Sequence, residues 1–301
     1  MSRGVSRRAF LSQSAMFAAG AAAMPLSTGA IEPIQRVGGP HLRIGNCAYS
    51  YRDYLQGKKA PKMTLEEFIS RMAETGIDGV ELTGYYFPDP LTLAYIKKIV
   101  RHCFLLGLDI CGSATRSTFT LPPGEARDKE IAHVKQWIDF SADMGSPCLR
   151  VFAGNAPPGA SEAQVQRWVV ECLEECSERA AEKGVMLALE NHGGVTATPE
   201  GVKAILSAVQ SEWVGLKLDT GNFHTKDPYA DLAQVAFYAI SVHVKTETHY
   251  NRETKPADLK RIVKLLTDVN YRGYLNLEYE AAEDPLTAVP RTLRELIRLT
   301  S

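Results

Sequence analysis

The feature of this sequence that most constrains its fold is an alternation of short apolar runs with longer amphipathic runs, repeated eight times. The short runs are bounded by turn residues and have the composition of strands; they lie near residues 42–48, 78–82, 108–114, 148–153, 185–190, 214–219, 240–245 and 274–279. The longer runs have helical periodicity and lie near residues 64–75, 91–106, 125–144, 161–183, 199–209, 228–238, 256–268 and 285–299. Eight strands, each followed by a helix, predict a single (β/α)8 barrel of the α/β class.

Local signals at the ends of the helical runs agree with this prediction. Thr64 is a good N-terminal capping residue, and Glu66 and Glu67 follow it in the first turn. A glycine, which favours the left-handed conformation at a helix end, follows four of the runs, at Gly76, Gly107, Gly145 and Gly184. The rival fold, an open doubly wound sheet, often has a glycine-rich turn after its first strand, whereas residues 47–51 contain no glycine.

The N-terminal segment carries a different pattern. Arg7 and Arg8 precede Phe10 and an Ala-rich stretch over residues 15–24, which resembles a twin-arginine export signal. We therefore expect residues 1–30 to be that signal, residues 31–301 to form the barrel, and the protein to be periplasmic or secreted. A basic arm or a membrane anchor is the alternative, but the stretch is short and Ala/Gly-rich for a membrane helix, so no stable membrane insertion is expected.

Composition excludes some classes of partner. The 301 residues are 45% hydrophobic and 23% charged, with a formal net charge of −1, which is ordinary for a globular protein. The part after residue 30 contains no long basic run, so nucleic-acid binding is not expected. The six cysteines form no CxxC pair and are interpreted mainly as small core residues. A homo-oligomer remains open.

Four potential metal ligands end four successive strand-like runs in the second half of the chain. They are Glu190, Asp219, His243 and Glu278, separated by about one strand–helix unit each. Three carboxylates and one imidazole suit Mn²⁺, Mg²⁺, Co²⁺ or Zn²⁺ in an open, catalytic site. In a (β/α)8 barrel the active site lies at the carboxyl ends of the strands, so we expect these four residues to converge on one divalent metal ion. A structural salt bridge is the alternative for any one of them.

The alternation of side chains along a strand adds further residues to the four candidate ligands. Residues two apart on a strand share a face, which pairs the four candidates with residues His192, Lys217, Lys245 and Glu280. Charged groups directed into a barrel are costly unless they are paired or bind a metal.

With these motifs the chain resembles the xylose-isomerase-like sugar isomerase/epimerase family of TIM barrels over roughly residues 42–299. The resemblance rests on Leu189-Glu190-Asn191-His192, Leu218-Asp219-Thr220-Gly221-Asn222, Val242-His243-Val244-Lys245 and Leu277-Glu278-Tyr279-Glu280. It implies the same four metal ligands, and Glu81 matches a glutamate that the family has after its second strand. Many members have histidine where this chain has Asn222, so the contacts with substrate on that side are expected to differ. Related DNA-repair endonucleases use a three-metal cluster with more histidines than this chain offers.

The ligand set predicts chemistry on a carbonyl compound. A divalent metal ion polarises a carbonyl and stabilises the enediolate that forms when a neighbouring C–H proton leaves. Carboxylates remove and return that proton, and Glu190 and Glu278 are the candidate catalytic residues. The expected substrate-binding residues are Glu81, Arg150, His192, Asn222 and Lys245. Aromatic residues that could face a sugar, about half of them expected to be packing residues instead, are Tyr49, Tyr51, Tyr85, Tyr86 and Phe87.

These inferences predict an enzyme with a small carbohydrate substrate. The leading hypothesis is a divalent-metal-dependent sugar isomerase or epimerase. The alternative is a metal-dependent lyase or hydrolase that acts on oxidised (3-keto) glycosides, which export would favour. A secreted sugar-binding protein with a structural metal is the third possibility. The sequence identifies neither the sugar nor the metal.

Overall fold

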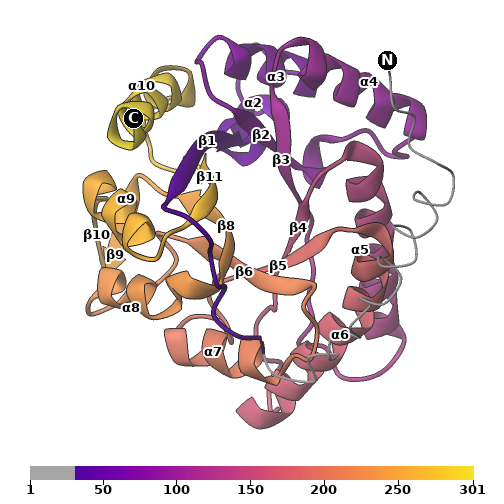
Figure 1. Cartoon of the computed structure of the whole chain (residues 1–301). Helices are drawn as coiled ribbons and strands as arrows, with labels where there is room; N and C mark the ends of the chain where they lie inside the picture. Colours follow the sequence, from indigo (N-terminus) through magenta and orange to yellow (C-terminus); the bar gives the residue numbers. More distant parts are fainter. Residues whose placement is uncertain (1–30) are drawn as a thin grey trace, which may run out of the picture.

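The computed structural model describes residues 31–301, and its centre is a closed barrel of eight parallel strands inside a ring of helices (Figure 1). The order of strands around the barrel is β1-β11-β8-β6-β5-β4-β3-β2, and β1 closes it by pairing with both β11 and β2. The barrel strands are β1 His41–Cys47, β2 Gly79–Thr83, β3 Asp109–Ala114, β4 Cys148–Val151, β5 Met186–Glu190, β6 Val214–Asp219, β8 Ala239–Val244 and β11 Arg272–Leu277. The predicted (β/α)8 barrel is confirmed; the predicted export signal, residues 1–30, lies outside the described residues.

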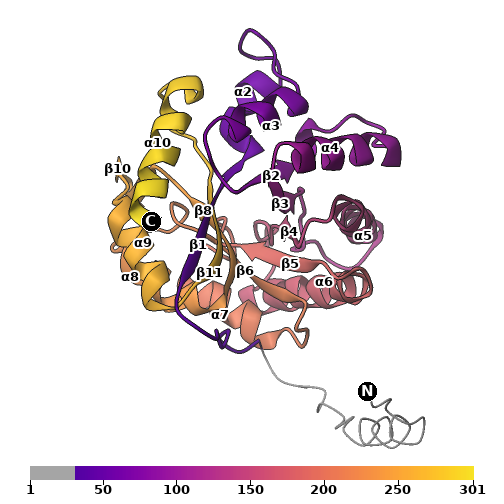
Figure 2. The ribbon, with the colours of Figure 1, turned by 45° about the horizontal axis from the view of Figure 1, so that its top comes forward.

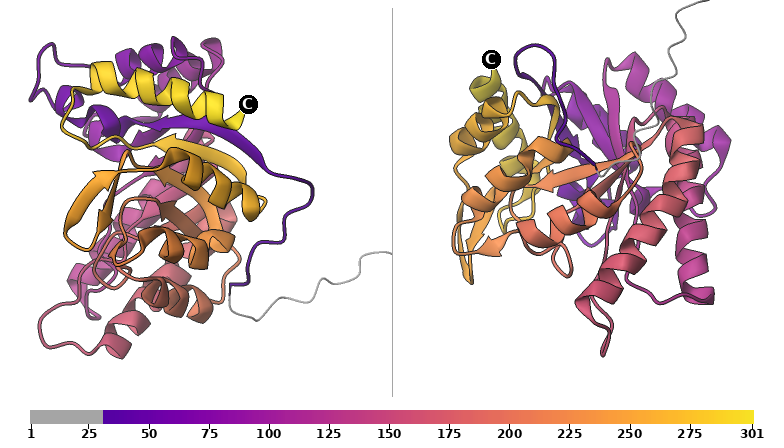
Figure 3. Two further views of the ribbon diagram at one scale, coloured as in Figure 1. Left: turned by 90° about the vertical axis from the view of Figure 1, so that its left-hand side faces the viewer. Right: turned by 60° about the horizontal axis from the view of Figure 1, so that its bottom comes forward.

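The eight long helices follow the strands as the periodicity predicts. They are α3 Leu65–Ala73, α4 Leu93–Leu105, α5 Glu125–Met144, α6 Glu162–Lys183, α7 Pro199–Ala208, α8 Pro228–Val235, α9 Leu259–Asp268 and α10 Pro285–Thr300. Figure 2 shows them around the barrel, and α10 packs beside β1 (Figure 3). Short helices occupy some loops: η1 Ala48–Tyr51, α2 Arg52–Leu55, η2 Gly84–Tyr86 and η3 Ala236–Tyr238.

The predicted helix ends are confirmed in detail. Thr64 and Glu67 form a reciprocal capping box at the start of α3, in which each side chain accepts a hydrogen bond from the backbone N–H of the other. Gly145 and Gly184 end α5 and α6 with φ of 70° and 68°, values that glycine adopts without a Cβ clash.

Burial explains why the strands read as continuous apolar runs. Every residue of β2 and β6 is buried, because the helices cover the outer face of the barrel and side chains fill its interior. A polar residue within such a run therefore points either at a helix or into the barrel, and its charge must find a partner there.

One segment differs from the prediction. Residues 247–256 form a hairpin of β9 Glu247–Tyr250 and β10 Glu253–Pro256, which joins the short strand β7 His224–Thr225 in a second, three-stranded sheet (Figure 3). The turn is made by Asn251, with φ of 56°, a conformation that asparagine tolerates better than most residues. The helix expected from residue 256 therefore begins at Leu259.

Among residues 31–301, the search for membrane spans found no helix with the length and apolarity to cross a bilayer.

Candidate metal centre

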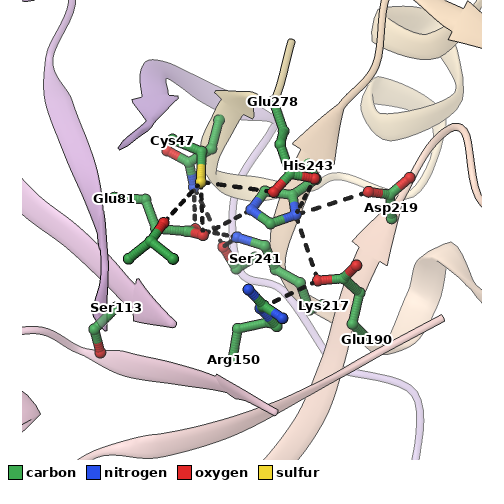
Figure 4. A network of polar contacts seen from close by, with 12 residues as sticks. Cys47, Glu81, Ser113, Arg150, Glu190, Lys217, Asp219, Ser241, His243 and Glu278 are labelled. Atoms are coloured by element: carbon green, nitrogen blue, oxygen red, sulfur yellow. Dashed lines mark hydrogen bonds and ion pairs between the residues drawn. The ribbon is translucent and has the colours of Figure 1, made fainter. Parts of the chain in front are cut away.

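The four predicted ligands come together at the carboxyl end of the barrel (Figure 4). Glu190 and Asp219 are the last residues of β5 and β6, His243 is the penultimate residue of β8, and Glu278 directly follows β11. Asp219 lies beside His243 in the register of β6 and β8. One ligand atom from each of the four residues lies within 4.8 Å of the others, and all four side chains are buried. The predicted convergence is therefore present in the geometry.

Three of the atoms that face one another make no hydrogen bond within the described residues. His243 Nδ1 lies 3.5 Å from Glu190 Oε2, 3.8 Å from Asp219 Oδ2 and 3.4 Å from Glu278 Oε2. Glu190 Oε2, Asp219 Oδ2 and His243 Nδ1 are buried and make no hydrogen bond in the described part of the chain. Buried polar atoms without partners are costly, so three such atoms directed at one point indicate a site that binds something.

The remaining atom of each ligand is held by its neighbours. Asn222 Nδ2 donates to Glu190 Oε1 at 3.2 Å, and the backbone N–H of Gly221 donates to Asp219 Oδ1 at 2.8 Å. His243 Nε2 lies 2.7 Å from a carboxylate oxygen of Glu81. These contacts leave one atom each of Glu190, Asp219 and His243 directed at the common point, whereas the Glu278 oxygen that faces it, Oε2, is also bonded to Lys245.

The spacing of these atoms fits a metal ion. In a tetrahedral site with bonds of about 2.1 Å, neighbouring ligand atoms lie about 3.4 Å apart. The three distances from His243 Nδ1 are 3.4–3.8 Å. Carboxylate oxygens and an imidazole nitrogen are ligands for Mn²⁺, Co²⁺ and Zn²⁺, and the carboxylates also suit Mg²⁺. Glu190, Asp219, His243 and Glu278 therefore fit one divalent cation.

The electrostatics of the cluster favour positive charge at its centre. Burial opposes ionisation of Glu190 and Glu278, but Arg150 beside the first and His243 and Lys245 beside the second hold the pKa of each carboxyl below its usual value. Burial raises the pKa of Asp219 to about 7, against the opposing effect of Lys245. Burial lowers the pKa of His243, but Glu278 and Glu81 outweigh it and raise the pKa well above the usual value. The imidazole thus lies in a strongly negative environment.

Two buried cations border the cluster. Lys245 Nζ lies 2.5 Å from Glu278 Oε2 and 3.4 Å from Asp219 Oδ2, and it also contacts Glu280 Oε2. Arg150 Nε lies 3.4 Å from Glu190 Oε2, while its Nε and Nη1 make no hydrogen bond within the described residues. Both predicted residues are therefore beside the ligands, and Arg150 has free N–H groups for another molecule.

The structure places Glu81 behind one of the candidate ligands. Its side chain is fully buried inside the barrel, behind His243, where it contacts His243, Lys217 and Asn276. Burial opposes its ionisation, but His243 and Lys217 outweigh that effect and lower its pKa to about 2. Both carboxylate oxygens of Glu81 are therefore occupied by other side chains, one of them His243, and its predicted contact with substrate stays a prediction.

Of the other predicted substrate-binding residues, one lies in the cluster and one lies outside it. Asn222 touches Glu190 and is part of the cluster. His192 is exposed and stacks on Phe152, with ring centroids 4.0 Å apart; it makes no contact with the four ligands. Because β5 ends at Glu190, the alternation that paired His192 with Glu190 does not continue past that strand.

As expected, some of the candidate aromatic residues are packing residues and do not lie beside the cluster. Tyr51 is buried against Phe68, and Phe87 packs on Trp137. The Tyr85 hydroxyl lies 3.5 Å from Arg150 Nη2, and the Tyr86 hydroxyl is buried without a partner in residues 31–301. Tyr85 therefore lies beside Arg150 at the edge of the cluster.

Sequence reasoning missed the buried polar layer beneath the ligands. Lys217 contacts Glu81 and donates to Ser241 Oγ at 3.0 Å, and Asn276 donates to Glu81 at 3.2 Å. A usable signal was present, because Lys217 and Asn276 are single polar residues inside otherwise apolar strand runs, each two positions before a predicted ligand.

Comparison with known proteins identifies the family. A model described as a xylose isomerase-like TIM barrel matches residues 69–299, well over half of the chain. The chain belongs to this family. The resemblance inferred from the strand-end motifs is thus confirmed, and the chain is an enzyme of this barrel family.

The chain is similar to proteins named inosose dehydratase. One, from Clostridium botulinum (strain Alaska E43 / Type E3), is 25% identical over 286 residues, covering 83% of this chain and 92% of its own. Another, from Klebsiella pneumoniae (strain 342), is 28% identical over 269 residues, covering 75% of this chain and 85% of its own.

Two solved structures share the fold. The 3-keto-D-glucoside 4-epimerase from E. coli superposes with a TM-score of 0.66 at 18% identity, covering 86% of this chain and 99% of its own. The IOLI protein with a bound zinc atom gives a TM-score of 0.67 at 17% identity, covering 86% of this chain and 96% of its own. At these identities the structures show the barrel and nothing finer.

Proposed function

We propose that this protein is a divalent-metal-dependent lyase. Glu278 would remove a proton next to the carbonyl of a keto-polyol or keto-glycoside, and the departing β-oxygen would take up that proton and leave as water or alcohol. The observation that carries the proposal is the convergence of Glu190 Oε2, Asp219 Oδ2 and His243 Nδ1, which are buried and make no hydrogen bond within residues 31–301, beside Glu278. The relatives named inosose dehydratases support the lyase reading, because a dehydratase eliminates water.

Glu190, Asp219, His243 and Glu278 would hold the metal ion, which when bound supplies a Lewis acid for the substrate carbonyl. Glu278 is the proposed base, because its carboxyl is kept ionised by Lys245 and His243. Lys245 stays charged, since its carboxylate neighbours raise its pKa well above the usual value despite burial. It is therefore a fixed positive group that stabilises negative charge as the proton leaves.

Arg150 is the proposed contact for a substrate oxygen. Its guanidinium is buried over the ring of Phe152, with Cζ 3.9 Å from the ring centroid, and two of its nitrogens are free among the described residues. A hydroxyl or carbonyl oxygen that accepted from Nη1 would lie beside Glu190. Burial of the whole cluster excludes water, which strengthens each of these interactions.

Both cations beside the cluster are already paired with carboxylates, Lys245 with Glu278 and Arg150 with Glu190. A phosphate group would have to compete with those carboxylates for the same cations. We therefore infer an unphosphorylated substrate.

Epimerisation is the second candidate, and one observation favours it. Glu190 and Glu278 come from strands β5 and β11, which are separated by β6 and β8 around the barrel. They can therefore approach a bound substrate from different sides, as a two-carboxylate proton exchange requires. Against it, both carboxyls have lowered pKa values, so neither is held in the protonated form that would return the proton.

The two candidates are separated by their products. The metal-loaded protein would be incubated in D₂O with an inosose, a 3-keto-glycoside and a free ketose, each followed by mass spectrometry and NMR. Loss of water or of the alcohol from the keto substrate supports the lyase, and an isomer of unchanged composition with deuterium at the epimerised carbon supports the epimerase. Absence of both with metal bound would contradict the proposal.

We also propose that the protein is exported by the twin-arginine route, on the basis of Arg7, Arg8 and the Ala-rich stretch after Phe10. Replacement of Arg7 and Arg8 by lysine should retain the protein in the cytoplasm of a host with this pathway. Cell fractionation of the wild-type and double-variant chains measures this, and equal distribution of the two would contradict it.

A further inference from the structure

The ring of His243 has two different sides (Figure 4). Its Nδ1 faces one carboxylate oxygen each of Glu190, Asp219 and Glu278 at 3.4–3.8 Å. Its Nε2 faces the opposite way and lies 2.7 Å from Glu81 Oε1. The imidazole therefore bridges the metal centre and a buried carboxylate that belongs to no part of the proposed chemistry.

Glu81 is itself fixed by a buried ion pair. Its second oxygen, Oε2, contacts Lys217 Nζ and accepts from Asn276 Nδ2 at 3.2 Å. Lys217 also donates to Ser241 Oγ at 3.0 Å. Both Glu81 and Lys217 have 0% relative exposure. Two charges at that depth are retained only as a pair, because either alone would carry a large desolvation cost.

The pair determines which nitrogen of His243 is free. A carboxylate can only accept a hydrogen bond, so the Nε2 beside Glu81 carries a hydrogen in either protonation state of the ring, and Nδ1 is the nitrogen left to bind a metal ion. The same contact prevents the ring from rotating away. Metal-binding histidines are commonly oriented in this way by a carboxylate on the other nitrogen, which also makes the ligand nitrogen more basic.

Lys217 has a separate role within the pair. Three carboxylates already surround the centre, and Glu81 unpaired would add a fourth negative charge inside the barrel. The ammonium of Lys217 cancels that charge and occupies Oε2, which leaves Oε1 for His243. The pair thus supplies an acceptor without changing the net charge behind the ligand.

We propose that Glu81 and Lys217 are positioning residues that hold His243 with Nδ1 directed at the metal ion. This inference rests on the metal centre of the proposed function, but not on the reaction that the centre catalyses. It assigns a purpose to the polar layer of the barrel interior, where an apolar layer is usual.

The test is the affinity of the metal-free full-length protein for Mn²⁺ and, separately, Zn²⁺, measured by calorimetry. In E81L/K217M both charges are removed together, which is often neutral for stability, and the acceptor for Nε2 is lost. We expect metal binding to weaken about 10- to 100-fold. In E81Q/K217M the charges are also removed, but the glutamine oxygen still accepts from Nε2, so most of the affinity should return.

S113A is the matched control. Ser113 is a buried polar residue of a barrel strand that bonds to Ser141 and the backbone of Cys148, away from His243. Its replacement should leave metal affinity unchanged. Thermal unfolding of each metal-free variant reports on folding independently of the metal.

Wild-type affinity in E81L/K217M, or an equal loss in E81Q/K217M, would overturn the proposal. If E81L/K217M does not fold, ¹⁵N NMR of the histidines in the Zn²⁺-loaded wild type decides, because the proposal requires zinc on Nδ1 and hydrogen on Nε2 of His243. Zinc on Nε2 overturns it. Wild-type protein that binds neither metal overturns it together with the metal centre, whereas protein that binds metal but converts no substrate contradicts the proposed function alone.

Discussion

The two halves of the barrel contribute differently to the site. The second half supplies all four candidate ligands, from β5, β6, β8 and β11, at or beside the carboxyl ends of the strands. The first half supplies Glu81 and Arg150, from within β2 and β4, and each contacts a ligand from the side or from behind. The second half therefore supplies the candidate ligands, and the first half supplies one residue behind them and one beside them.

The two residues of the first half differ in depth. Arg150 is the penultimate residue of β4, as His243 is of β8, so it can face a bound molecule, whereas Glu81 lies in the middle of β2 and contacts other side chains. Changes at the candidate ligands should alter chemistry or metal binding directly. Changes in the first half should have smaller effects, at Arg150 through contact with substrate and at Glu81 through His243.

The largest effect is expected for E278Q in the second half. Glutamine keeps an oxygen that can bind the metal ion but cannot accept a proton, so turnover should fall roughly 10²- to 10⁴-fold. Metal content should remain partly preserved. Both are measured on the same preparation, by rate and by elemental analysis, and the same change at Glu190 tests whether the two carboxylates act as a pair.

E280Q is the control for that variant, because Glu280 also contacts Lys245 but its side chain is 41% exposed and is not one of the four ligands. It should retain activity within a few-fold. Near-normal turnover of metal-loaded E278Q would remove Glu278 as the base.

Removal of the metal ion should lower thermal stability. A ligand at about 100 times its Kd stabilises the folded state by about 2.7 kcal/mol, which for a domain of this size corresponds to roughly 5–10 °C in Tm. Differential scanning calorimetry with and without chelator measures the shift. D219N, which loses a ligand oxygen charge in the same half, should show little metal-dependent shift; a shift as large as that of the wild type would place the metal elsewhere.

A smaller effect is expected for R150M in the first half. Methionine keeps much of the packing on Phe152 but removes the N–H groups that face the cluster. Loss of a hydrogen bond from a charged group costs about 1.5–3 kcal/mol, so kcat/KM should fall roughly 10- to 150-fold.

R116M is the matched control, since Arg116 is exposed and stacks on Tyr85 at 4.7 Å, outside the ligand cluster. It should change kcat/KM by no more than a few-fold. If R116M and R150M behaved alike, the loss would reflect surface charge and not the contact beside Glu190.

The smallest effect is expected for H192A. His192 is exposed, stacks on Phe152 and touches none of the four ligands, so any contact with substrate would be the same in the ground and transition states. KM should then rise a few-fold with kcat unchanged. Steady-state kinetics measure both constants. A loss in kcat as large as that of E278Q would show that His192 takes part in the reaction itself.

The sequence by itself determined the barrel and the ligand set. Eight alternating runs and their glycine ends predict the fold because helix and strand periods are local properties. Glu190, Asp219, His243 and Glu278 could be found because the carboxyl ends of parallel strands share one end of a barrel, whatever the loops between them do. The hairpin over residues 247–256 was missed because its short polar strands have no apolar face, and they are recognisable only once β7 is beside them.

Only the tertiary structure decided which polar residues face one another inside the barrel. Glu81 and His243 are 162 residues apart, and Lys217 is 136 residues from Glu81. Their contact depends on the stagger between strands that are not neighbours, which sets the depth of each side chain and is not encoded in any local pattern. The sequence could therefore show that Glu81 is a charged residue in a buried strand, but only the closed barrel places it behind His243.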